Sequence, residues 1–489
     1  MNRHPEDRIH KLVRIAIIAV AASLLTFAMM LYKCEPPDNQ VVQPSKVAAK
    51  EKRIDQASTV TEMQPSAKYE FPKRIFEVLK SKARPILIVG RAGTGKTTLI
   101  REILRDKAIK QIVVAPTGVA ALNCGGATIH SFFRIPPGLS DPSKLDRIAG
   151  KQATLIRKLE RVIIDEISMV RADLLDMIDH RLRTVRKSEE PFGGVQVVMV
   201  GDFFQLPPVL TDNEAELFAQ EYKTRYVFSA KVFQNLKPYI VELSRVYRQE
   251  NKDFTELLAN IRNGTNLEST IAKLNSTCFG EHRSGKVPLL LTGHNEIADK
   301  YNQAELQKLP GKVHTYGGTL EGDFNISKSN LPAPHLLYLK VGARVMMLKN
   351  DPRQRWANGN LATVTRLNDE EIRVRIDGRD SEYLVEQETW ERYAYALSSG
   401  EISSQVVGRY SQFPIKLSWA STIHKAQGLT LDDVRIDLSY RSFESGQMYV
   451  ALSRVTSIAG LSFTAPLSHK DVITDPELPN LFSVDEAIS

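Results

Sequence analysis

Short apolar runs, each followed by polar residues or glycine, recur between positions 86 and 200 of the chain. The runs are Ile86–Val89, Ile112–Ala115, Val162–Ile164 and Val195–Val200. Each run is apolar at successive positions, as strands are when helices cover both faces of a parallel sheet. After the first run, Leu99, Ile103 and Leu104 recur with helical spacing. The pattern therefore predicts an α/β domain that binds its ligands where the strands end.

The N-terminal segment has a different pattern, because residues Ile15 to Tyr32 include no charged side chain. A run of this length can span a bilayer, whereas a secretory signal has a shorter apolar region and a small-residue cleavage site. We therefore expect a transmembrane helix at about 15–32, within an N-terminal segment of residues 1–34. Residues 35–67 are polar and contain four prolines, which is typical of a tether.

The composition is that of a globular protein with room for several domains. The chain has 489 residues, of which 42% are hydrophobic and 25% charged, and this length suggests roughly three domains. Its formal net charge of +8 is compatible with a polyanionic partner. The three cysteines, Cys34, Cys124 and Cys278, show no metal-ligand spacing. A reducing compartment is therefore expected rather than a disulfide framework.

The turn after the first apolar run carries a phosphate-binding sequence. Residues 90–97 read GRAGTGKT, which fits the pattern G-x-x-x-x-G-K-[ST] between a strand and a helix. Glycines let successive N–H groups point at phosphates, and the start of the next helix adds partial positive charge. Lys96 is expected to reach the β- and γ-phosphates, and Thr97 to ligate Mg²⁺. The expected nucleotide contacts are Gly90, Gly93, Thr94, Gly95, Lys96, Thr97 and Thr98.

Two further strand ends supply groups that nucleotide hydrolysis requires. The third run ends at Asp165 and Glu166; Asp165 is expected to hold Mg²⁺ and Glu166 to polarise the attacking water. The fourth run is followed by GDFFQLPP at 201–208, in which Gln205 can bond the γ-phosphate or the attacking water. Taken alone, an acidic turn is common at a strand end, and Asp202 could equally be a helix cap. After a phosphate loop, the same residues predict a nucleotide hydrolase.

Small residues, hydroxyls and aromatic rings follow the second apolar run. Residues 115–121 read APTGVAA, and residues 128–133 read TIHSFF. Such a mixture can hold a nucleic-acid backbone and stack on bases. For His130 alone, a buried hydrogen-bonded imidazole is the more common interpretation. The expected contacts with nucleic acid in these segments are Pro116, Thr117, Gly118, His130, Ser131 and Phe132.

These segments, in this order, resemble the helicase motifs of superfamily 1. GRAGTGKT, APTGVAA, TIHSFF, IIDEISMV and GDFFQLPP are most similar to those of the PIF (petite integration frequency) and RecD-like DNA helicases. RADLLDMID at 171–179 resembles the helical signature that separates the PIF branch from RecD. The resemblance covers about residues 71–463.

The resemblance also assigns roles to residues in the second half of the chain. LSRVYRQ at 243–249 is similar to the family's fourth motif, which implies that Arg248 reaches the γ-phosphate. YVALSR at 449–454 resembles the sixth motif, and Arg454 would act as an arginine finger on the transferring phosphoryl group.

WASTIHKAQG at 419–428 resembles the fifth motif, which touches the DNA backbone and couples to the nucleotide. The resemblance implies DNA contacts by Thr422 and His424, and nucleotide contacts by Gln427 and Gly428.

The implied architecture is a pair of RecA-like parallel-sheet domains that face each other across an ATP–Mg²⁺ cleft, with a small inserted β-barrel. Alternating residues such as Ile372–Ile376 mark strands of the insertion. The expected boundaries are 68–240 for the first RecA-like domain, 241–359 with 412–475 for the second, 360–411 for the barrel and 476–489 for a C-terminal tail.

The resemblance implies ATP-dependent, 5′-to-3′ translocation on single-stranded DNA and unwinding of tailed duplexes, in DNA repair, recombination, or telomere and replication maintenance. A membrane-tethered DNA translocase ATPase in DNA uptake or transfer is one alternative, and a catalytically dead DNA-binding adaptor is another. RNA stays open as a substrate, because contacts to a backbone distinguish the two sugars poorly. The sequence names no protein partner.

One departure from the family concerns the base of the nucleotide. The family usually has a glutamine upstream of the phosphate loop that reads adenine, and the stretch KYEFPKR at 68–74 has none. Hydrolysis of several nucleotides is therefore compatible with the sequence.

Charge does not orient the apolar segment, because basic residues such as Arg14 and Lys33 flank it on both sides. ATP and nucleic acid are cytosolic, so we expect a membrane-anchored protein whose catalytic body is in the cytoplasm. Without an anchor, the protein would simply be cytoplasmic.

Overall fold

The computed structural model describes residues 71–488, except positions 72, 82–84, 140–141, 143–144, 250, 281–286, 325–330, 399–400, 440–441, 443, 482–483 and 485. They fall within one compact unit, residues 67–489. The expected transmembrane helix at 15–32 and the tether at 35–67 lie outside the described residues. Within the described ranges, no helix is both long enough and apolar enough to cross a membrane.

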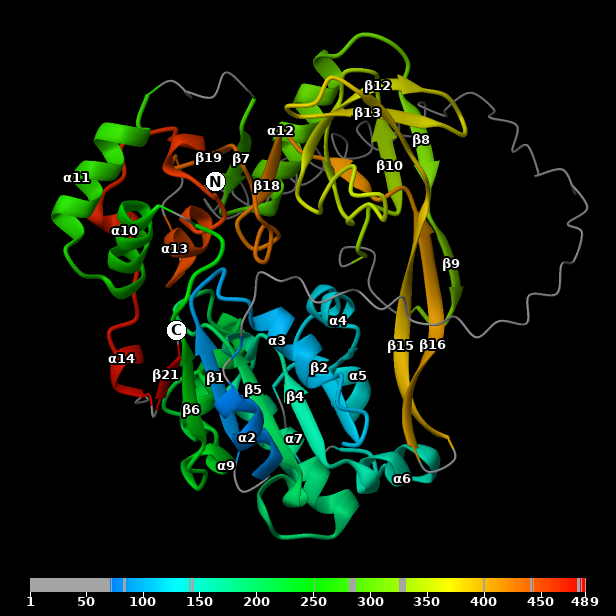
Figure 1. Ribbon diagram of the computed structural model, residues 1–489, viewed down its shortest axis with the longest axis vertical. Helices are drawn as coiled ribbons and strands as arrows, with labels where there is room; N and C mark the ends of the chain where they lie inside the picture. Colours follow the sequence, from blue (N-terminus) through cyan, green and yellow to red (C-terminus); the bar gives the residue numbers. More distant parts are fainter. Residues whose placement is uncertain are drawn as a thin grey trace, which may run out of the picture. The chain divides into compact units, whose positions relative to one another are not determined.

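A parallel sheet forms the centre of the first lobe (Figure 1). Among the described residues it has seven strands, in the order β21–β6–β1–β5–β4–β2–β3. The four apolar runs of the sequence form its interior strands, as predicted. The strands are β1 (Ile86–Gly90), β2 (Gln111–Ala115), β3 (Ala127–Thr128), β4 (Arg161–Ile164), β5 (Gln196–Gly201), β6 (Tyr239–Leu243) and β21 (Glu486–Ile488).

Helices cover both faces of this sheet, because alternate residues of each strand point to opposite sides. Ile86 and Ile88 of β1 pack in a core with Leu99 of α3. Leu87 and Val89 face a second, larger core that includes residues of α7. The helices of this lobe are α2 (Lys73–Ser81), α3 (Lys96–Ile103), α4 (Gly118–Cys124), α5 (Ile129–Phe133), α6 (Gly150–Lys158), α7 (Ala172–Arg186), α8 (Asp212–Glu221) and α9 (Lys231–Gln234).

The second lobe contains a smaller parallel sheet in the order β18–β7–β19–β20. Its strands are β7 (Leu289–Thr292), β18 (Ala420–Thr422), β19 (Val434–Ile436) and β20 (Leu461–Phe463). The helices α10 (Lys252–Asn263), α11 (Leu267–Cys278), α12 (Asn295–Lys308) and α13 (Gln447–Leu452) belong to this lobe (Figure 1). Cys278 of α11 and Cys124 of α4 are both buried.

Antiparallel strands occupy more of the chain than the segment 360–411 predicted for a β-barrel. A five-stranded sheet runs in the order β14–β13–β12–β11–β17, so it begins at Arg344 and ends at Leu417. The apolar residues Val345 and Met347 of β11 are fully buried in its core, which is why the sheet extends past the predicted boundaries. The strands are β11 (Arg344–Met347), β12 (Leu361–Leu367), β13 (Ile372–Ile376), β14 (Glu382–Val385) and β17 (Ile415–Leu417).

Two smaller antiparallel sheets lie beside it. One pairs β8 (His314–Gly317) with β10 (Leu336–Leu339), and the other joins β15 (Glu388–Ser398), β16 (Glu401–Gln412) and β9 (Thr319–Gly322). Strands β8, β9 and β10 fall within the segment 241–359 predicted for the second RecA-like domain, and they belong to these antiparallel sheets.

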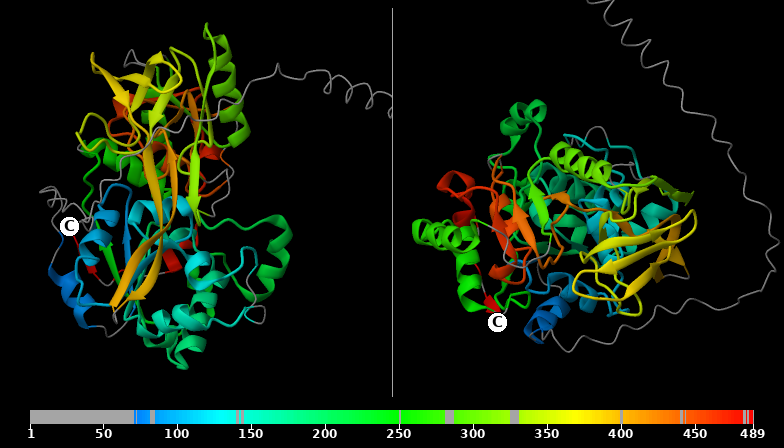
Figure 2. Two further views of the ribbon diagram at one scale, coloured as in Figure 1. Left: turned by 90° about the vertical axis from the view of Figure 1, so that its right-hand side faces the viewer. Right: turned by 90° about the horizontal axis from the view of Figure 1, so that it is seen from above.

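The long β15–β16 hairpin runs alongside the first lobe (Figure 2). The hydroxyl of Tyr395 on β15 accepts a hydrogen bond from Val113 N at 3.0 Å and donates one to Val113 O at 3.2 Å. Val113 lies on β2, which pairs with β3 only at Val114 and Ala115. Tyr395 therefore satisfies the backbone groups of β2 at the point where the neighbouring strand has not begun.

We expect Tyr395→Phe to lower the free energy of unfolding by about 1–2 kcal/mol, because it leaves a buried backbone N–H and C=O of Val113 unpaired. Chemical denaturation measures the change. Tyr338→Phe is the matched control, since Tyr338 on β10 is 47% exposed. Equal stability of the Tyr395 and Tyr338 variants would contradict this role of the hydroxyl.

The C-terminal residues 476–489, predicted as a tail, contribute to the first lobe. Leu478 in α14 (Leu478–Leu481) is buried in the larger core, and β21 pairs in parallel with β6. The predicted domain boundary at residue 240 also falls inside β6. The whole of β6, from Tyr239 to Leu243, pairs with β1 and therefore belongs to the first sheet. The other edge of β6 would be unpaired without β21, so the C-terminal segment covers it.

Candidate functional site

The phosphate loop lies between β1 and α3, at the carboxyl end of an interior strand of the first sheet. Gly93 and Gly95 have φ angles of 82° and 86°, a left-handed backbone that favours glycine. The ammonium of Lys96 folds over the loop and donates to the carbonyl oxygens of Gly90 at 2.8 Å and Arg91 at 3.0 Å. The charge is therefore held inside the loop, where phosphate oxygens can take the place of these carbonyls.

The three threonines of the loop lie in different surroundings. Thr94 is buried and donates to Arg91 O at 2.9 Å, so its hydroxyl braces the loop. Thr97, in the first turn of α3, is exposed, and Thr98 beside it is half-buried. Of the three, Thr97 has the hydroxyl most accessible to a ligand.

Asp165 and Glu166 follow β4, two strands away from β1 in the same sheet. The Asp165 carboxylate accepts a hydrogen bond from Glu166 N at 2.9 Å. Burial, reinforced by the charge of Glu166, raises the pKa of Asp165 to about 7. Burial also raises the pKa of Glu166, while Lys96 and Arg454 act in the opposite direction. A divalent cation would relieve the repulsion between these two carboxylates.

The donor set fits Mg²⁺, which is usually held by one or two carboxylates together with water and substrate phosphates. Asp165 and the accessible hydroxyl of Thr97 are the residues that would hold it. Across the described ranges, no group of three or more His, Cys, Asp or Glu side chains is placed to hold an ion, which is compatible with an ion that binds together with phosphates.

We expect Asp165→Asn to raise the free energy of unfolding at pH 8 by about 1–3 kcal/mol, because it removes a buried charge whose pKa is raised. The folded-state pKa of about 7 exceeds the unfolded value of about 3.9. The folded protein therefore binds more protons between those values, and its stability falls as pH rises through that window. Chemical denaturation in Mg²⁺-free buffer, at about pH 5 and about pH 8, measures the difference in stability between the variant and the parent.

The same substitution should lower nucleotide hydrolysis by roughly 100-fold or more, since it removes the ligand for Mg²⁺. Glu216→Gln, at an exposed position of α8, is the control for loss of one carboxylate. A variant that is less stable than the parent at pH 8 would contradict the repulsion inferred for Asp165.

Two arginines of the second lobe approach the same cluster. Arg248 donates to Ser453 O at 3.1 Å, and a Cβ at Gly93 of the phosphate loop would lie 2.6 Å from the Cβ of Arg248. Arg454 is 1% exposed and donates to Val450 O at 2.9 Å. Burial and the charge of Arg248 lower the pKa of Arg454 to about 9, against the effect of Glu166 and other anionic groups. Cations from both lobes are thus concentrated at the phosphate loop.

Asp202, after β5, is the centre of a network that joins the two lobes. Its carboxylate accepts hydrogen bonds from Gln205 Nε2 at 3.0 Å, Arg262 Nη2 at 3.2 Å and the Tyr449 hydroxyl at 3.4 Å. Arg262 belongs to α10 and Tyr449 to α13, both in the second lobe. The Tyr449 hydroxyl also accepts a hydrogen bond from Ala92 N in the phosphate loop at 3.1 Å. The loop, the end of β5 and the second lobe are therefore connected directly.

No motif in the sequence assigns a role to Arg262 or to Tyr449. Arg262 lies on an amphipathic helix, where an arginine usually belongs to a solvated face, and its guanidinium is instead 3.8 Å from the ring centroid of Phe204. Tyr449 opens the YVALSR segment, but nothing in that pattern says that its ring reaches the phosphate loop. Only the fold brings these residues together.

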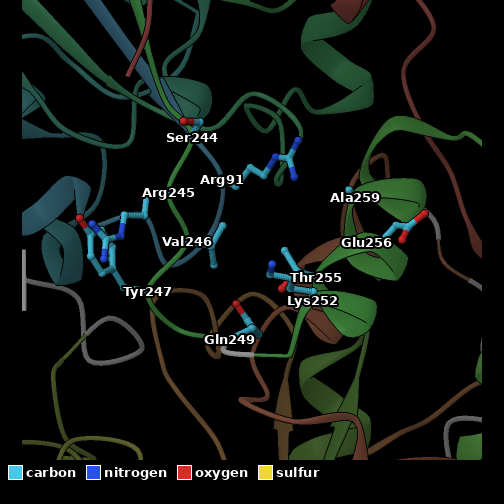
Figure 3. Close-up of a pocket in the computed structure, with 10 residues that line it drawn as sticks. All are labelled: Arg91, Ser244, Arg245, Val246, Tyr247, Gln249, Lys252, Thr255, Glu256 and Ala259. Atoms are coloured by element: carbon cyan, nitrogen blue, oxygen red, sulfur yellow. The ribbon is translucent and has the colours of Figure 1, made fainter. Parts of the chain in front are cut away.

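A pocket of about 880 Å³ opens beside the phosphate loop (Figure 3). Arg91 of the loop lines it, together with residues 244–247, Gln249 and one side of α10. Within the lining, the guanidinium of Arg245 lies 5.0 Å from the ring centroid of Tyr247. The pocket combines charged, hydroxyl and aromatic groups, the mixture that a nucleoside needs. Its lining residues are Arg91, Ser244, Arg245, Val246, Tyr247, Gln249, Lys252, Thr255, Glu256 and Ala259.

The nucleic-acid contacts predicted in the first lobe follow β2 and β3. Thr117 caps α4 by accepting a hydrogen bond from Ala120 N at 3.2 Å, between Pro116 and Gly118 of the same turn. His130 Nδ1 lies 3.0 Å from Ile135 O, so its imidazole is held by the local backbone. These bonds are compatible with the structural interpretation of His130 that the sequence left open.

Ser131 and Phe132 contact the β15–β16 hairpin. Arg392 of β15 donates to Ser131 Oγ at 2.9 Å. Phe132 is 4% exposed, and its ring meets Tyr395 edge to face with centroids 5.7 Å apart. The Phe132 ring is therefore in the core and offers no free face on which a base could stack, in contrast to the prediction.

The residues of the fifth motif lie at the end of β18 and in the turn that follows. Thr422 is buried, and its hydroxyl lies 3.5 Å from Asn295 Oδ1, whereas His424 is exposed. Gln427 donates to Gln205 Oε1 at 3.4 Å across the two lobes. Gly428 O accepts a hydrogen bond from Arg248 at 3.5 Å. Gln427 and Gly428 thus contact Gln205 and Arg248, two residues with predicted roles at the nucleotide.

Comparison with known proteins identifies related chains. A family model described as PIF1-like helicase matches residues 64–271, and one described as DNA helicase Pif1, 2B domain, matches residues 325–367. The human ATP-dependent DNA helicase PIF1 is 35% identical over 413 residues, which cover 81% of this chain and 61% of the relative. The chain thus spans about three fifths of the human protein's length. The ATP-dependent DNA helicase Pif1 of Bdellovibrio bacteriovorus is 33% identical over 410 residues, which cover 82% of this chain and 89% of the relative.

Solved structures of Pif1 from Bacteroides sp share the fold. The complex with ADP-AlF4 has a TM-score of 0.77 and 37% identity, and it covers 83% of this chain and 94% of the other. Bacteroides Pif1 bound to ssDNA has a TM-score of 0.61 and 38% identity over the same shares. The α/β helicase fold with parallel sheets is therefore confirmed.

Proposed function

The chain belongs to the PIF1-like helicase family, and on this premise we propose that it is an ATP-dependent DNA helicase. It moves 5′ to 3′ along single-stranded DNA and separates the duplex ahead of it, with ATP and Mg²⁺ bound between the lobes. The names of the human and bacterial relatives, and the ADP-AlF4 and ssDNA complexes of the Bacteroides protein, support this proposal.

The observation that carries the proposal is that cationic side chains of both lobes lie close to carboxylates at the phosphate loop. Lys96 lies within the electrostatic reach of Asp202, Glu166, Asp165 and Arg248. Such a cluster has the charges that phosphoryl transfer needs: cations for the phosphates, a carboxylate for the metal and another for water. A dead adaptor would not need to keep all of them.

Each residue of the cluster has a defined role in the proposed mechanism. Lys96 neutralises the β- and γ-phosphates, and Glu166 polarises the attacking water, which Gln205 helps to orient. Arg248 and Arg454 stabilise the charge that develops on the transferring phosphoryl group. Bound Mg²⁺ supplies further neutralisation of the phosphates.

Movement of the lobes couples hydrolysis to stepping on DNA. The network around Asp202 ties the phosphate loop to α10 and α13, so a change in the loop is passed to the second lobe. The first lobe presents the segment 116–118 together with His130 and Ser131 to the strand, and the second presents Thr422 and His424. A change in the distance between these contacts moves the strand in one direction.

Strand displacement tests the proposal directly. The full chain, purified in detergent, is given ATP and duplexes with either a 5′ or a 3′ single-stranded tail. We expect displacement only from the 5′ tail. DNA-stimulated hydrolysis without displacement would favour a membrane-tethered translocase, and a complete lack of hydrolysis would favour an adaptor.

The pocket in Figure 3 is the proposed site of the nucleoside, because it opens directly beside the phosphate loop. With no glutamine at 68–74 to read adenine, the protein should hydrolyse GTP and CTP as well as ATP. Competition among the three nucleotides measures this selectivity. Exclusive use of ATP would show that other residues read the base.

Membrane attachment through Ile15 to Tyr32 is a separate proposal, motivated by the length of the uncharged run. In this arrangement the N-terminus is short and external, and the catalytic body is in the cytoplasm. Protease treatment of sealed cells tests it: an N-terminal tag should be cut and the body protected. Digestion of the body from outside, or recovery of the protein in the soluble fraction, would refute the arrangement.

A further inference from the structure

Arg262 on α10 is a buried cation to which the proposed mechanism gives no chemical step. Its guanidinium reaches from the second lobe to the segment after β5, where Nη2 donates to Asp202 Oδ1 at 3.2 Å. Nη1 donates to Asn263 Oδ1 at 3.1 Å, and the guanidinium carbon lies 3.8 Å from the ring centroid of Phe204. A planar group that is bonded at two nitrogens and stacked on a ring is held in one geometry. Arg262 therefore fixes one oxygen of the Asp202 carboxylate.

The other oxygen of the same carboxylate is held by Tyr449 of α13. The buried Tyr449 hydroxyl donates to Asp202 Oδ2 at 3.4 Å and accepts a hydrogen bond from Ala92 N at 3.1 Å. Asp202 is 1% exposed, so these side chains, rather than bulk water, satisfy its charge. Two helices of the second lobe thus determine the position of a carboxylate in the first.

The Asp202 carboxylate in turn fixes the side-chain amide of Gln205. Gln205 Nε2 donates to Asp202 Oδ2 at 3.0 Å. An ionised carboxylate only accepts hydrogen bonds, so it selects the amino end of the amide and turns Oε1 the other way. Gln427 Nε2 donates to that oxygen at 3.4 Å, which agrees with this orientation. An amide oxygen has two lone pairs, so Oε1 can accept one more hydrogen bond.

The backbone of Gln205 is in contact with the second lobe as well. Gly446, directly before α13, has a φ of 73°, and a Cβ at this position would lie 2.5 Å from Gln205 O. Glycine is required for so close an approach of two backbone segments. The start of α13 therefore packs on the Gln205 backbone, while Tyr449 of the same helix acts on its side chain through Asp202.

The orientation of this amide matters for hydrolysis. The water that attacks the γ-phosphorus must direct a lone pair at it and its protons at acceptors. The carbonyl oxygen of Gln205 can accept a hydrogen bond from this water, whereas an amide turned by half a rotation would present an NH₂ group, which only donates. A residue that fixes the amide therefore affects the attack without touching the nucleotide.

We propose that Arg262 and Tyr449 are positioning residues for hydrolysis. Through Asp202, they keep the carbonyl oxygen of Gln205 directed at the attacking water. The inference rests on the proposed function and deepens it, because it makes the orientation of the water depend on contact between the lobes. When the lobes separate, Asp202 loses both partners from the second lobe, the amide can turn, and hydrolysis slows.

Steady-state kinetics test this role. The full chain in detergent is assayed over a range of ATP concentrations with saturating oligothymidylate. Arg262→Lys keeps the charge but lacks the planar fork, so it should lower kcat roughly 10- to 100-fold while KM for ATP stays within about twofold. Tyr449→Phe keeps the buried ring and removes the hydroxyl, and it should lower kcat by a factor in the same rough range.

Combination with Gln205→Ala decides whether the effect passes through the amide. In a protein that lacks the amide, Arg262→Lys and Tyr449→Phe should each lower kcat further by less than about twofold. Reductions that multiply, as those of independent sites do, would overturn the positioning role. Single variants that hydrolyse ATP at the parent's rate would overturn it equally.

Arg409→Lys and Tyr338→Phe are the matched controls, because both side chains are about half exposed. Each should retain the parent's kcat. Thermal unfolding of every variant detects loss of structure, and a fall in kcat that follows only the melting temperature would make Arg262 a structural cation. If Arg262→Lys does not fold, Tyr449→Phe carries the test, since it retains the apolar contacts of the ring.

The outcomes separate this inference from the proposed function. A parent protein that hydrolyses no ATP in the presence of DNA would refute the function and the positioning role together. A parent that hydrolyses ATP at a rate that Gln205→Ala leaves unchanged would refute only the positioning role.

Discussion

Lys96→Ala should reduce ATP hydrolysis by at least about 1000-fold, with or without DNA. The Lys96 ammonium is held inside the phosphate loop by Gly90 O and Arg91 O at 2.8 and 3.0 Å, where no other lysine side chain of the loop can replace it. Alanine removes the charge that stabilises the transferring phosphoryl group and leaves those carbonyls without their donor. Steady-state ATPase assays with saturating single-stranded DNA measure the loss.

Lys107→Ala is the control for this substitution, because Lys107 is exposed in the turn after α3. It should retain the parent's rate. A fluorescent oligonucleotide checks that the Lys96 variant still binds DNA, which would place the defect in the nucleotide site. Turnover by the Lys96 variant within about tenfold of the parent would refute the site itself.

The fold of the first lobe was predictable where the chain carries its own local pattern. The interior strands β1, β2, β4 and β5 are continuous apolar runs, because helices cover both faces of the sheet. The phosphate loop and the carboxylates at 165–166 were predictable for the same reason, since each directly follows one of these strands. In a parallel sheet the carboxyl ends lie at a common edge, so the order of runs along the chain already places these groups near one another.

Other features depend on contacts between distant parts of the chain and have no local signal. β21 covers the edge of β6 although almost the whole second lobe separates them in sequence. Phe132 was expected to stack on bases, because an aromatic ring beside a hydroxyl is typical of nucleic-acid contacts. The structure buries this ring against Tyr395, which belongs to a hairpin more than 250 residues away. Whether the Phe132 ring is exposed depends on where that hairpin lies, and the local sequence around Phe132 does not indicate this.

The network around Asp202, at the functional site, also depends on contacts between distant parts of the chain. Asp202 was compatible with a simple helix cap, and its partners Arg262 and Tyr449 lie on two helices of the other lobe. Their hydrogen bonds at 3.2 and 3.4 Å exist only once the lobes are assembled. Coupling between the phosphate loop and the second lobe is therefore a property of tertiary structure, even though each lobe's own motifs are visible in the sequence.

Arg454→Lys should lower kcat for ATP hydrolysis by about 1000-fold while nucleotide binding is retained, because an arginine finger acts through its planar guanidinium. Arg454 is 1% exposed, and two of its nitrogens are already fixed by Val450 O and Ser453 Oγ, at 2.9 and 2.7 Å. These bonds orient the remaining N–H groups. A lysine keeps the charge but has no second nitrogen to place, so the loss reports geometry rather than net charge.

Arg409→Lys, at a half-exposed position of β16, should leave hydrolysis unchanged and is the control for the exchange. Binding of a fluorescent ATP analogue separates an effect on nucleotide binding from an effect on hydrolysis. Arg454 is expected to act on the transition state more than on the bound nucleotide. If Arg454→Lys instead weakened nucleotide binding and lowered kcat together with the melting temperature, the guanidinium would have a structural role. A normal melting temperature with a large loss of kcat would mean that the second lobe completes the catalytic site, and that hydrolysis requires both lobes together.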